Sequence, residues 1–122
     1  MLTTIVGSQY LPDFSKCVLF LEDVEEAPYR IDRMLTQLKL AGILAKASAV
    51  VFGNCTDCDP GNGFGSLTVE DALVEHVKPL GVPAWYGAQI GHIEKQFTLP
   101  YGAEVEVDAA KGTIRMVEGA VS

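Results

Sequence analysis

Two residues far apart in the chain have the side chains for acid–base chemistry together. Glu22 follows the apolar run 17–21, and His92 follows Gly91 in a later loop. A histidine accepts a proton near neutral pH, and a carboxylate bonded to its other ring nitrogen fixes the tautomer and stabilises the imidazolium. Glycine beside His92 allows backbone or substrate to approach closely. The pair is a candidate catalytic unit. The alternative is that Glu22 only ends a strand and His92 bonds a backbone carbonyl.

A nucleophile for this pair is not evident in the sequence. None of the serines lies in a Gly-x-Ser-x-Gly elbow between a strand and a helix; they are Ser8, Ser15, Ser48, Ser66 and Ser122. Cys17 is predicted to begin a buried strand, where a thiol usually acts as a small apolar group. The local sequence therefore offers an acid and a base without the group that they would activate.

Other charged residues near Glu22 have two interpretations. Arg30 and Arg33 could fork onto a substrate carboxylate, because a guanidinium binds that group through two parallel hydrogen bonds. Pairing with Glu25, Glu26 or Asp32 is an equally good use of both arginines. His76 is most simply a partly exposed helix residue.

The segment from Cys55 to Cys58 has the C-x-x-C spacing of half a zinc site. A second such pair is missing, so a closed four-ligand site would also need Asp57, Asp59 or His92. A thioredoxin-like redox role is less favoured, because that motif opens a helix early in its fold. We expect two reduced loop cysteines.

The glycines and acids that follow do not form a recognisable ion or phosphate site. The stretch 57–63 resembles a calcium loop, but its oxygen ligands miss the EF-hand offsets and no closing glutamate follows. Gly61-x-Gly63-x-Gly65 lacks the dinucleotide fingerprint and a P-loop lysine. It is predicted to be a flexible turn.

The elements that would position Glu22 and His92 alternate between strand and helix. Apolar runs predict buried strands at 17–21, 48–53 and 82–87, the first of them buried on both faces. Helical spacing from Ile31 to Ala41 predicts a helix with Pro28 in its first turn and Gly42 at its end. Thr68 to Asp71 resembles a capping box that starts a second helix, which ends near Pro79.

This alternation predicts a parallel sheet with right-handed crossovers. Parallel strands bring their carboxyl ends to one edge, so Glu22, the loop after Gly53 and the loop after Gly87 should be neighbours. Beyond His92 the apolar period becomes two, which predicts antiparallel strands with one solvated face. These alternating positions are Phe97, Leu99, Val105, Val107, Ile114 and Met116. The fold class is therefore α/β, with a smaller antiparallel layer packed on the parallel sheet.

Composition narrows the class of protein. A chain of 122 residues that is 48% hydrophobic is expected to form a single domain, residues 1–122. A net charge of -7 repels nucleic acid and anionic membranes, and no apolar run approaches the roughly 20 residues that span a bilayer. The odd count of 3 cysteines does not form a secreted disulfide framework. We expect a cytoplasmic protein without an export signal.

Several stretches together resemble a known family. Residues 19–35, which begin Leu-Phe-Leu-Glu-Asp, resemble the signature stretch of LD-carboxypeptidases, serine peptidases that trim murein tetrapeptides. Three further stretches agree in family order: 51–58 with Val-Phe-Gly and Thr-Asp-Cys, 87–92 ending in Gly-His, and 99–102, Leu-Pro-Tyr-Gly. The resemblance covers essentially the whole chain.

The resemblance implies a Ser, Glu, His triad in that chain order, without metal or cofactor, to which Glu22 and His92 would contribute the last two members. The serine and its oxyanion-hole donor would lie in an N-terminal domain that is absent here, and the chain would match the family's C-terminal, swivelling β/β/α domain. The substrate implied is a murein peptide ending in D-alanine, and the isolated chain is expected to be inactive. Two alternatives remain. One is an immunity-type peptidase that cleaves a toxic peptidyl nucleotide, and the other is a non-catalytic binding or dimerisation module, for which a homodimer is the candidate assembly.

Overall fold

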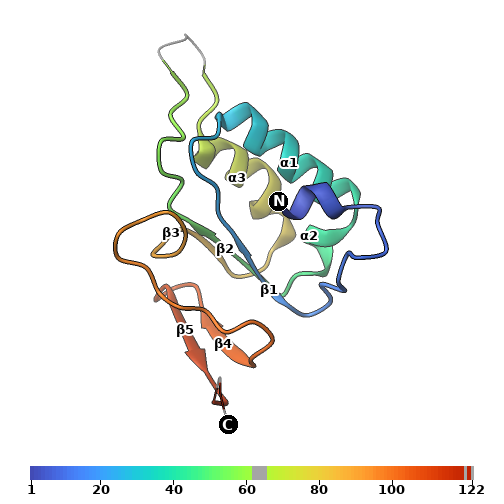
Figure 1. Ribbon diagram of the computed structural model, residues 1–122, viewed down its shortest axis with the longest axis vertical. Coiled ribbons are helices and arrows are strands. Elements are labelled where there is room, and N and C mark those ends of the chain that lie inside the picture. Colours follow the sequence, from blue (N-terminus) through green and yellow to red (C-terminus); the bar gives the residue numbers. More distant parts are fainter. Residues whose placement is uncertain (62–65, 120, 122) are drawn as a thin grey trace.

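Three layers make up the fold. In the computed structural model, which describes residues 1–61, 66–119 and 121, a parallel sheet carries helices on one face and an antiparallel hairpin beyond the other (Figure 1). The parallel sheet has the order β1-β2-β3, with β1 at Val18–Leu21, β2 at Ala49–Gly53 and β3 at Ala84–Ala88. The hairpin pairs β4, Val105–Asp108, with β5, Thr113–Met116. The α/β class predicted from the sequence is confirmed.

The two crossover helices are confirmed with their expected ends. Helix α1, Pro28–Leu40, has Pro28 in its first turn, and Gly42 follows it in the left-handed region at φ 73°. Helix α3, Val69–Val77, begins with a capping box in which the Thr68 hydroxyl accepts the Asp71 N–H and the Asp71 carboxylate accepts the Thr68 N–H. Aspartate therefore serves in the position where glutamate or glutamine is usual. Short helices complete this layer: η1, Leu2–Ile5, α2, Ile43–Lys46, and η2, Lys78–Leu80.

The core lies between the helices and the central strand. Every residue of β2 is buried, and Val50 and Phe52 face the helix layer. Helix α1 buries Ile31, Leu35 and Leu38 against this face, each 2% exposed. Strand β2 lies between β1 and β3 and is buried on both faces, so a continuous apolar run suits its position.

Strand β1 differs from its prediction. Only Leu19 is buried, while Val18, Phe20 and Leu21 are half-buried, so the expectation of a strand buried on both faces is wrong. In the described part of the chain β1 is an edge strand of the sheet, with β2 as its one neighbouring strand. Cys17 is exposed and precedes the strand, so it does not have the buried apolar role predicted for it.

The antiparallel layer is smaller than the alternating pattern predicts. Val105 pairs with Met116 and Val107 with Ile114, which puts these apolar residues on one face. Phe97 and Leu99 belong to a loop instead of a strand. That loop and the hairpin enclose a cavity of about 330 Å³ against the sheet residues Phe20 and Trp85.

Two remaining expectations concern a turn and a membrane span. Gly63 and Gly65 of the predicted turn lie outside the described residues. Within the described residues, no helix has both the length and the apolar character that crossing a bilayer requires.

Candidate active site

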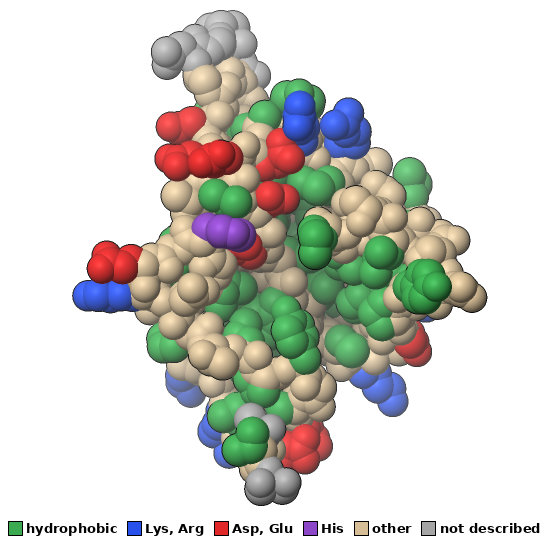
Figure 2. Space-filling view, in the orientation of Figure 1, with side chains coloured by type: hydrophobic (Ala, Val, Ile, Leu, Met, Phe, Trp, Pro, Cys, Tyr) green, Lys and Arg blue, Asp and Glu red, His purple; other side chains and the backbone are tan. Residues whose placement is uncertain are grey.

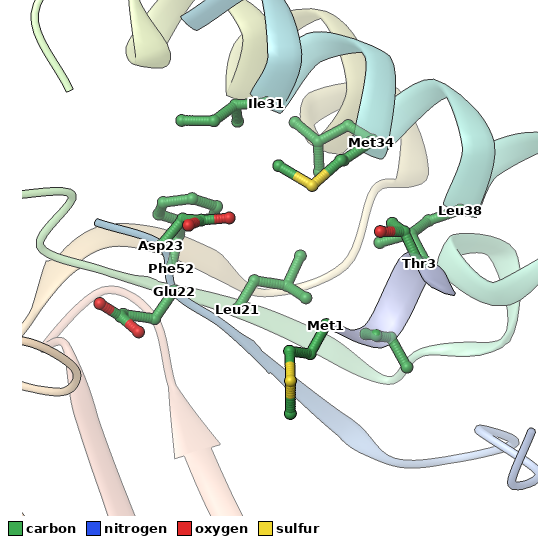
Figure 3. Close-up of a pocket in the computed structure, with 11 residues that line it drawn as sticks. Met1, Thr3, Leu21, Glu22, Asp23, Ile31, Met34, Leu38 and Phe52 are labelled. Atoms are coloured by element: carbon green, nitrogen blue, oxygen red, sulfur yellow. The ribbon is translucent and has the colours of Figure 1, made fainter. Parts of the chain in front are cut away.

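The site forms where the parallel strands end. Glu22 directly follows β1, the loop after Gly53 follows β2, and the loop that carries His92 follows β3. Residues at i and i+1 of an extended chain point to opposite faces. Figure 3 accordingly shows Asp23 on the helix side of this strand end and Glu22 on the other side, toward the loop that carries His92. The three loops predicted to be neighbours meet here.

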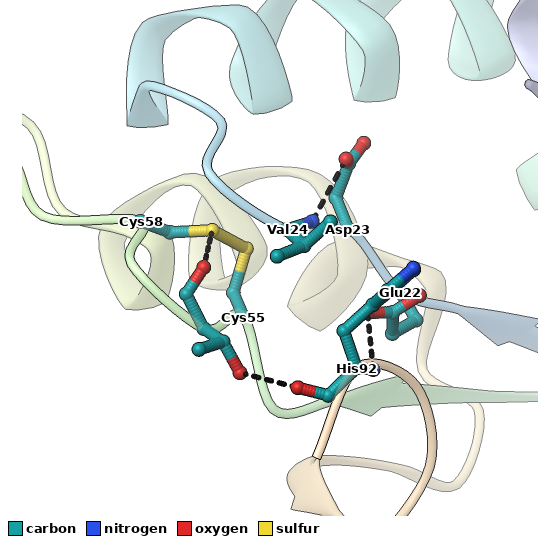
Figure 4. Close-up of polar contacts among 7 residues, drawn as sticks. Glu22, Asp23, Val24, Cys55, Cys58 and His92 are labelled. Carbon is teal, nitrogen blue, oxygen red and sulfur yellow. Dashed lines mark hydrogen bonds and ion pairs between the residues drawn. A yellow bond between two sulfur atoms is a disulfide. The ribbon is translucent and has the colours of Figure 1, made fainter.

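Glu22 and His92 are directly bonded. One carboxylate oxygen, Oε1 of Glu22, lies 2.9 Å from Nδ1 of the His92 ring and 3.1 Å from the His92 backbone nitrogen (Figure 4). An ionised carboxylate can only accept hydrogen bonds, so Nδ1 carries the proton and Nε2 keeps its lone pair. The alternative in which His92 bonds a backbone carbonyl through its ring is not what the structure shows.

Glycine at position 91 makes this contact possible. A Cβ atom on Gly91 would lie 2.0 Å from Cγ of Glu22, and the residue has φ +98°, a conformation that L side chains rarely adopt. Gly53 is also crowded, since a Cβ there would lie 2.7 Å from the Ile90 carbonyl oxygen. Both positions therefore need glycine for space, and Gly91 needs it for its backbone angle as well.

The environment of the pair suits a base that works at the surface. The His92 side chain is 65% exposed, whereas the Glu22 side chain is 18% exposed. The hydrogen bond to Glu22 and the negative charges of Glu22 and Asp23 raise the pKa of His92 above its ordinary value. The arrangement holds an imidazole with its free nitrogen accessible and stabilises the cation formed when that nitrogen takes a proton.

The loop after β2 forms hydrogen bonds with both segments that carry the Glu22–His92 pair. Thr56 forms an isolated parallel bridge with Val24, and its carbonyl oxygen accepts the Glu25 N–H at 2.9 Å. Its hydroxyl donates to the His92 carbonyl oxygen at 3.1 Å (Figure 4). In the sequence Thr56 stands out only within the family-like stretch 51–58, and its role is not evident there, because a contact across 36 positions leaves no local pattern.

The prediction of reduced loop cysteines is wrong. Cys55 and Cys58 form a disulfide, with their Cα atoms 5.5 Å apart (Figure 4). That separation is ordinary for a disulfide, and a turn with Asp57 at φ 55° brings the two residues together. As a disulfide the two sulfurs are not thiolates available to a metal. The described residues contain no cluster of three or more His, Cys, Asp or Glu arranged to hold an ion.

His76 and the arginines have structural partners. His76 is buried, 5% exposed, and its Nε2 lies 2.8 Å from Oδ1 of Asp32, so the prediction of a partly exposed residue is wrong. Position 76 follows Val69 by two helical turns, which places it on the buried face of α3. Arg30 pairs with Glu26 at 3.4 Å, one of the pairings left open by the sequence. Arg33 lies over the Tyr29 ring.

Apolar surface lies along one side of the site. A cavity of about 410 Å³ runs along Glu22 and Gly91 and is lined by Phe20, Phe97 and Tyr101. Tyr101 is 99% exposed and Phe97 is 67% exposed. Figure 2 shows apolar side chains gathered across this face, beside a histidine and a group of acidic side chains. His92 therefore lies on the border between an acidic edge and an apolar face.

Comparison with known proteins places this arrangement in a family. The model of the LD-carboxypeptidase C-terminal domain matches residues 1–107. The probable murein peptide carboxypeptidase of Bacillus subtilis strain 168 is 35% identical over 100% of this chain and 38% of its own length. The crystal structure of muramoyltetrapeptide carboxypeptidase from Oxalobacter formigenes superposes with a TM-score of 0.79 at 34% identity, covering 95% of this chain and 40% of that one.

A second kind of relative is similar in structure. The microcin C7 self-immunity protein MccF of Escherichia coli is 28% identical over 96% of this chain and 34% of its own length. A structure of MccF in complex with aspartyl sulfamoyl adenosine has a TM-score of 0.82 at 27% identity, covering 99% of this chain and 36% of that one. In each of these comparisons the chain spans well under half of the relative. The match along most of its length shows that the chain belongs to the LD-carboxypeptidase C-terminal domain family, a family of peptidases.

Proposed function

We propose that this chain is the single domain that supplies the acid and the base of a serine LD-carboxypeptidase triad. The observation that carries the proposal is the bond between Nδ1 of His92 and Oε1 of Glu22 at 2.9 Å, with Nε2 of an exposed ring left to accept a proton. Glu22 orients the ring and His92 is the general base. The serine nucleophile and the backbone donor of the oxyanion hole come from a domain outside these residues.

The proposed reaction is acyl transfer to serine followed by hydrolysis. Nε2 of His92 takes the serine proton as the hydroxyl attacks the carbonyl before the terminal D-alanine of a murein tetrapeptide. The imidazolium then protonates the leaving amine, and Glu22 stabilises the cation through Nδ1–H. Water attacks the acyl-enzyme with His92 again as the base, which releases the shortened peptide and regenerates the serine.

The similarity to carboxypeptidases that act on murein peptides supports this substrate class. A murein peptide would then be the partner of the site, and the cytoplasm, where released peptides are recycled, remains the predicted location. A triad without its nucleophile keeps only what binding and electrostatics supply. The chain alone is therefore expected to release no measurable D-alanine.

A chimera tests the proposal. Residues 1–122 replace the matching 38% of the Bacillus subtilis relative, whose remaining residues would supply the serine. The chimera should release D-alanine from a murein tetrapeptide, and His92→Ala or Glu22→Gln should abolish most of that release. Full-length relative is the positive control. Turnover by residues 1–122 alone, or a chimera indifferent to His92→Ala, would contradict the proposal.

An immunity-type peptidase is the second candidate, favoured by the TM-score of 0.82 to MccF bound to aspartyl sulfamoyl adenosine. Titration of the chain with that compound and with a murein tetrapeptide separates the two, with the NMR signals of His92 as the readout. Perturbation by the nucleotide analogue alone would favour this candidate.

A non-catalytic binding or dimerisation module is a further alternative, and the apolar face around Phe97 and Tyr101 is the feature that favours it. Light scattering after size-exclusion chromatography measures the mass in solution. A stable dimer that buries His92 would argue for the module, whereas a monomer that binds neither ligand would argue against it.

A further inference from the structure

Thr56 connects the two segments that carry the Glu22–His92 pair. Its carbonyl oxygen accepts the Glu25 N–H at 2.9 Å, which anchors the chain just beyond Glu22. Its hydroxyl donates to the His92 carbonyl oxygen at 3.1 Å, which anchors the residue that carries the base. Thr56 touches neither ring nitrogen nor carboxylate, so it acts on the pair through the backbone.

The position of the His92 ring depends on such anchors. With 65% of its side chain exposed, the ring has little packing to fix its orientation. The backbone N–H and the Nδ1–H of His92 both donate hydrogen bonds to Oε1 of Glu22, so a small shift of the backbone at His92 would lengthen both hydrogen bonds together. Hydrogen bonds weaken steeply as distance and angle depart from their optimum.

The disulfide fixes the loop in which Thr56 lies. Cys55 and Cys58 flank Thr56 and are joined across a turn that includes Asp57 at φ 55°. Such a small covalent ring limits the backbone conformations open to the residues inside it. Cys58 is 8% exposed and Cys55 is half-buried, and a surface cavity of about 370 Å³ lined by both cysteines gives a small reductant a route to the disulfide.

We propose that Thr56 is a positioning residue for the Glu22–His92 pair and that the Cys55–Cys58 disulfide holds Thr56 in place, so that reduction loosens the pair. The proposal rests on the proposed catalytic role of the pair. Disulfides in a reducing compartment are usually transient and redox-sensing. The same covalent link would therefore make the base responsive to thiol reductants.

The reductant is a dithiol. One of its thiolates attacks a sulfur of the Cys55–Cys58 disulfide and forms a mixed disulfide, and the other protein sulfur leaves as a thiolate that takes up a proton. The second thiol of the reductant then displaces the remaining protein sulfur. Two protein thiols and one cyclic disulfide result, with two electrons and two protons transferred to the protein.

Substitution of Thr56 tests the positioning role without any need for turnover. Thr56→Val keeps the backbone carbonyl but removes the hydroxyl, so the His92 amide should exchange with solvent about 5-fold faster while the Glu25 amide stays unchanged. Thr56→Ser should restore wild-type exchange. Thr113→Val on the exposed face of β5 is the matched control and should change neither amide. Equal His92 exchange in wild type and Thr56→Val would overturn the positioning role.

Reduction tests the role of the disulfide. In a Cys17→Ser background, which removes the free exposed thiol, dithiothreitol should speed exchange at both Glu25 and His92 and move the ring titration of His92 toward that of free histidine. A Cys55→Ser, Cys58→Ser variant should show the faster exchange with or without reductant. Amides of β2 report whether the fold is intact. No change on complete reduction, verified by thiol counting, would overturn this part.

These readouts separate the two proposals. A chimera that fails to release D-alanine while Thr56→Val still speeds His92 exchange counts against the proposed function alone. If the chimera releases D-alanine at the same rate when unchanged, when it carries Thr56→Val and when reductant is added, the result counts against the positioning role alone.

Discussion

The chain has two histidines, and each is paired with a carboxylate, yet the two pairs lie in opposite environments. His76 is 5% exposed and joins α3 to Asp32 of α1 through Nε2 at 2.8 Å. His92 is 65% exposed and bonds Glu22 through Nδ1 at 2.9 Å, in a loop beyond the end of a strand. The bond lengths are nearly equal, so the distance alone does not separate a structural pair from a catalytic one.

The free ring nitrogen separates them. Nδ1 of His76 is buried and makes no hydrogen bond within the described residues, so no substrate reaches it. Nε2 of His92 belongs to an exposed side chain. A general base needs a nitrogen within reach of the proton that it removes. The comparison is consistent with a structural role for the His76–Asp32 pair and with the proton transfer proposed for the Glu22–His92 pair, and each of the following variants is expected to affect one pair more than the other.

The largest expected effect is on hydrolysis by the chimera. His92→Ala should lower the rate of D-alanine release by about 10⁴-fold or more, because loss of a triad base removes most of the rate enhancement. The midpoint of urea unfolding should hardly change, because the side chain is exposed. His76→Ala is the control and should lower the rate only in proportion to the unfolded fraction. Equal losses in the two variants would abolish the distinction between the pairs.

The next effect is on stability. His76→Ala leaves a cavity between α1 and α3 and removes the partner of Asp32, so the free energy of unfolding should fall by about 2–4 kcal/mol. Urea denaturation followed by circular dichroism measures it. A double-mutant cycle with Asp32→Ala isolates the coupling between the two side chains. A change below about 0.5 kcal/mol would show that the buried pair is not a structural link.

The two histidines also show what the sequence could and could not predict. Helical spacing predicts α1 and α3 well, and the same spacing places position 76 beside Val69, Ala72 and Leu73, so burial of His76 could have been read from it. The carboxyl-end rule for parallel strands brings Glu22 and His92 to one edge of the sheet, where their side-chain chemistry makes them a candidate acid–base pair, and the resemblance to a family adds the missing serine. Both inferences depend on regular, periodic structure.

Irregular structure and strand order are harder to predict from the sequence. The runs that form β1 and β2 are equally apolar, yet β1 is an edge strand and β2 is central, because strand order depends on contacts between distant segments. Thr56 and the Cys55–Cys58 disulfide lie in a loop whose conformation depends on His92 and Glu25. A C-x-x-C spacing permits a disulfide, zinc ligation or two free thiols, and only the backbone turn decides between them.

A third variant separates backbone strain from disruption of the Glu22–His92 pair. Gly91→Ala puts a methyl group 2.0 Å from Cγ of Glu22, whereas Gly112→Ala, also at positive φ, meets nothing within 4 Å. Both should lose about 1 kcal/mol from the strained backbone, and Gly91→Ala should lose roughly 1 kcal/mol more as Glu22 moves. Only Gly91→Ala should move the NMR titration of His92 toward that of free histidine. If Gly112→Ala did the same, the contact with Glu22 would not be the cause.

The smallest expected effect is the pH dependence of stability. The hydrogen bond that the His92 Nδ1–H donates to Glu22, with the charges of Glu22 and Asp23, raises the pKa of His92 in the folded state above the value of about 6.5 expected when unfolded. The folded state therefore binds the proton more tightly, and this stabilisation is fully present below about pH 6.5 and is lost as the pH rises through the folded pKa. Salt should weaken it, because the ring is exposed.

Urea midpoints measured for wild type and Glu22→Gln between about pH 6 and 9 test this last difference, because all other titrating groups are common to both proteins. The two curves should converge as the pH rises, and the NMR titration of Glu22→Gln should give His92 a pKa closer to that of free histidine. In the chimera, hydrolysis requires neutral His92, so the rate of hydrolysis should rise with pH through the raised pKa of His92. A conservative Glu22→Asp variant should keep part of this increase in the pKa. Curves that stay parallel would mean that Glu22 does not stabilise the imidazolium, and His92 would then differ from His76 in exposure alone.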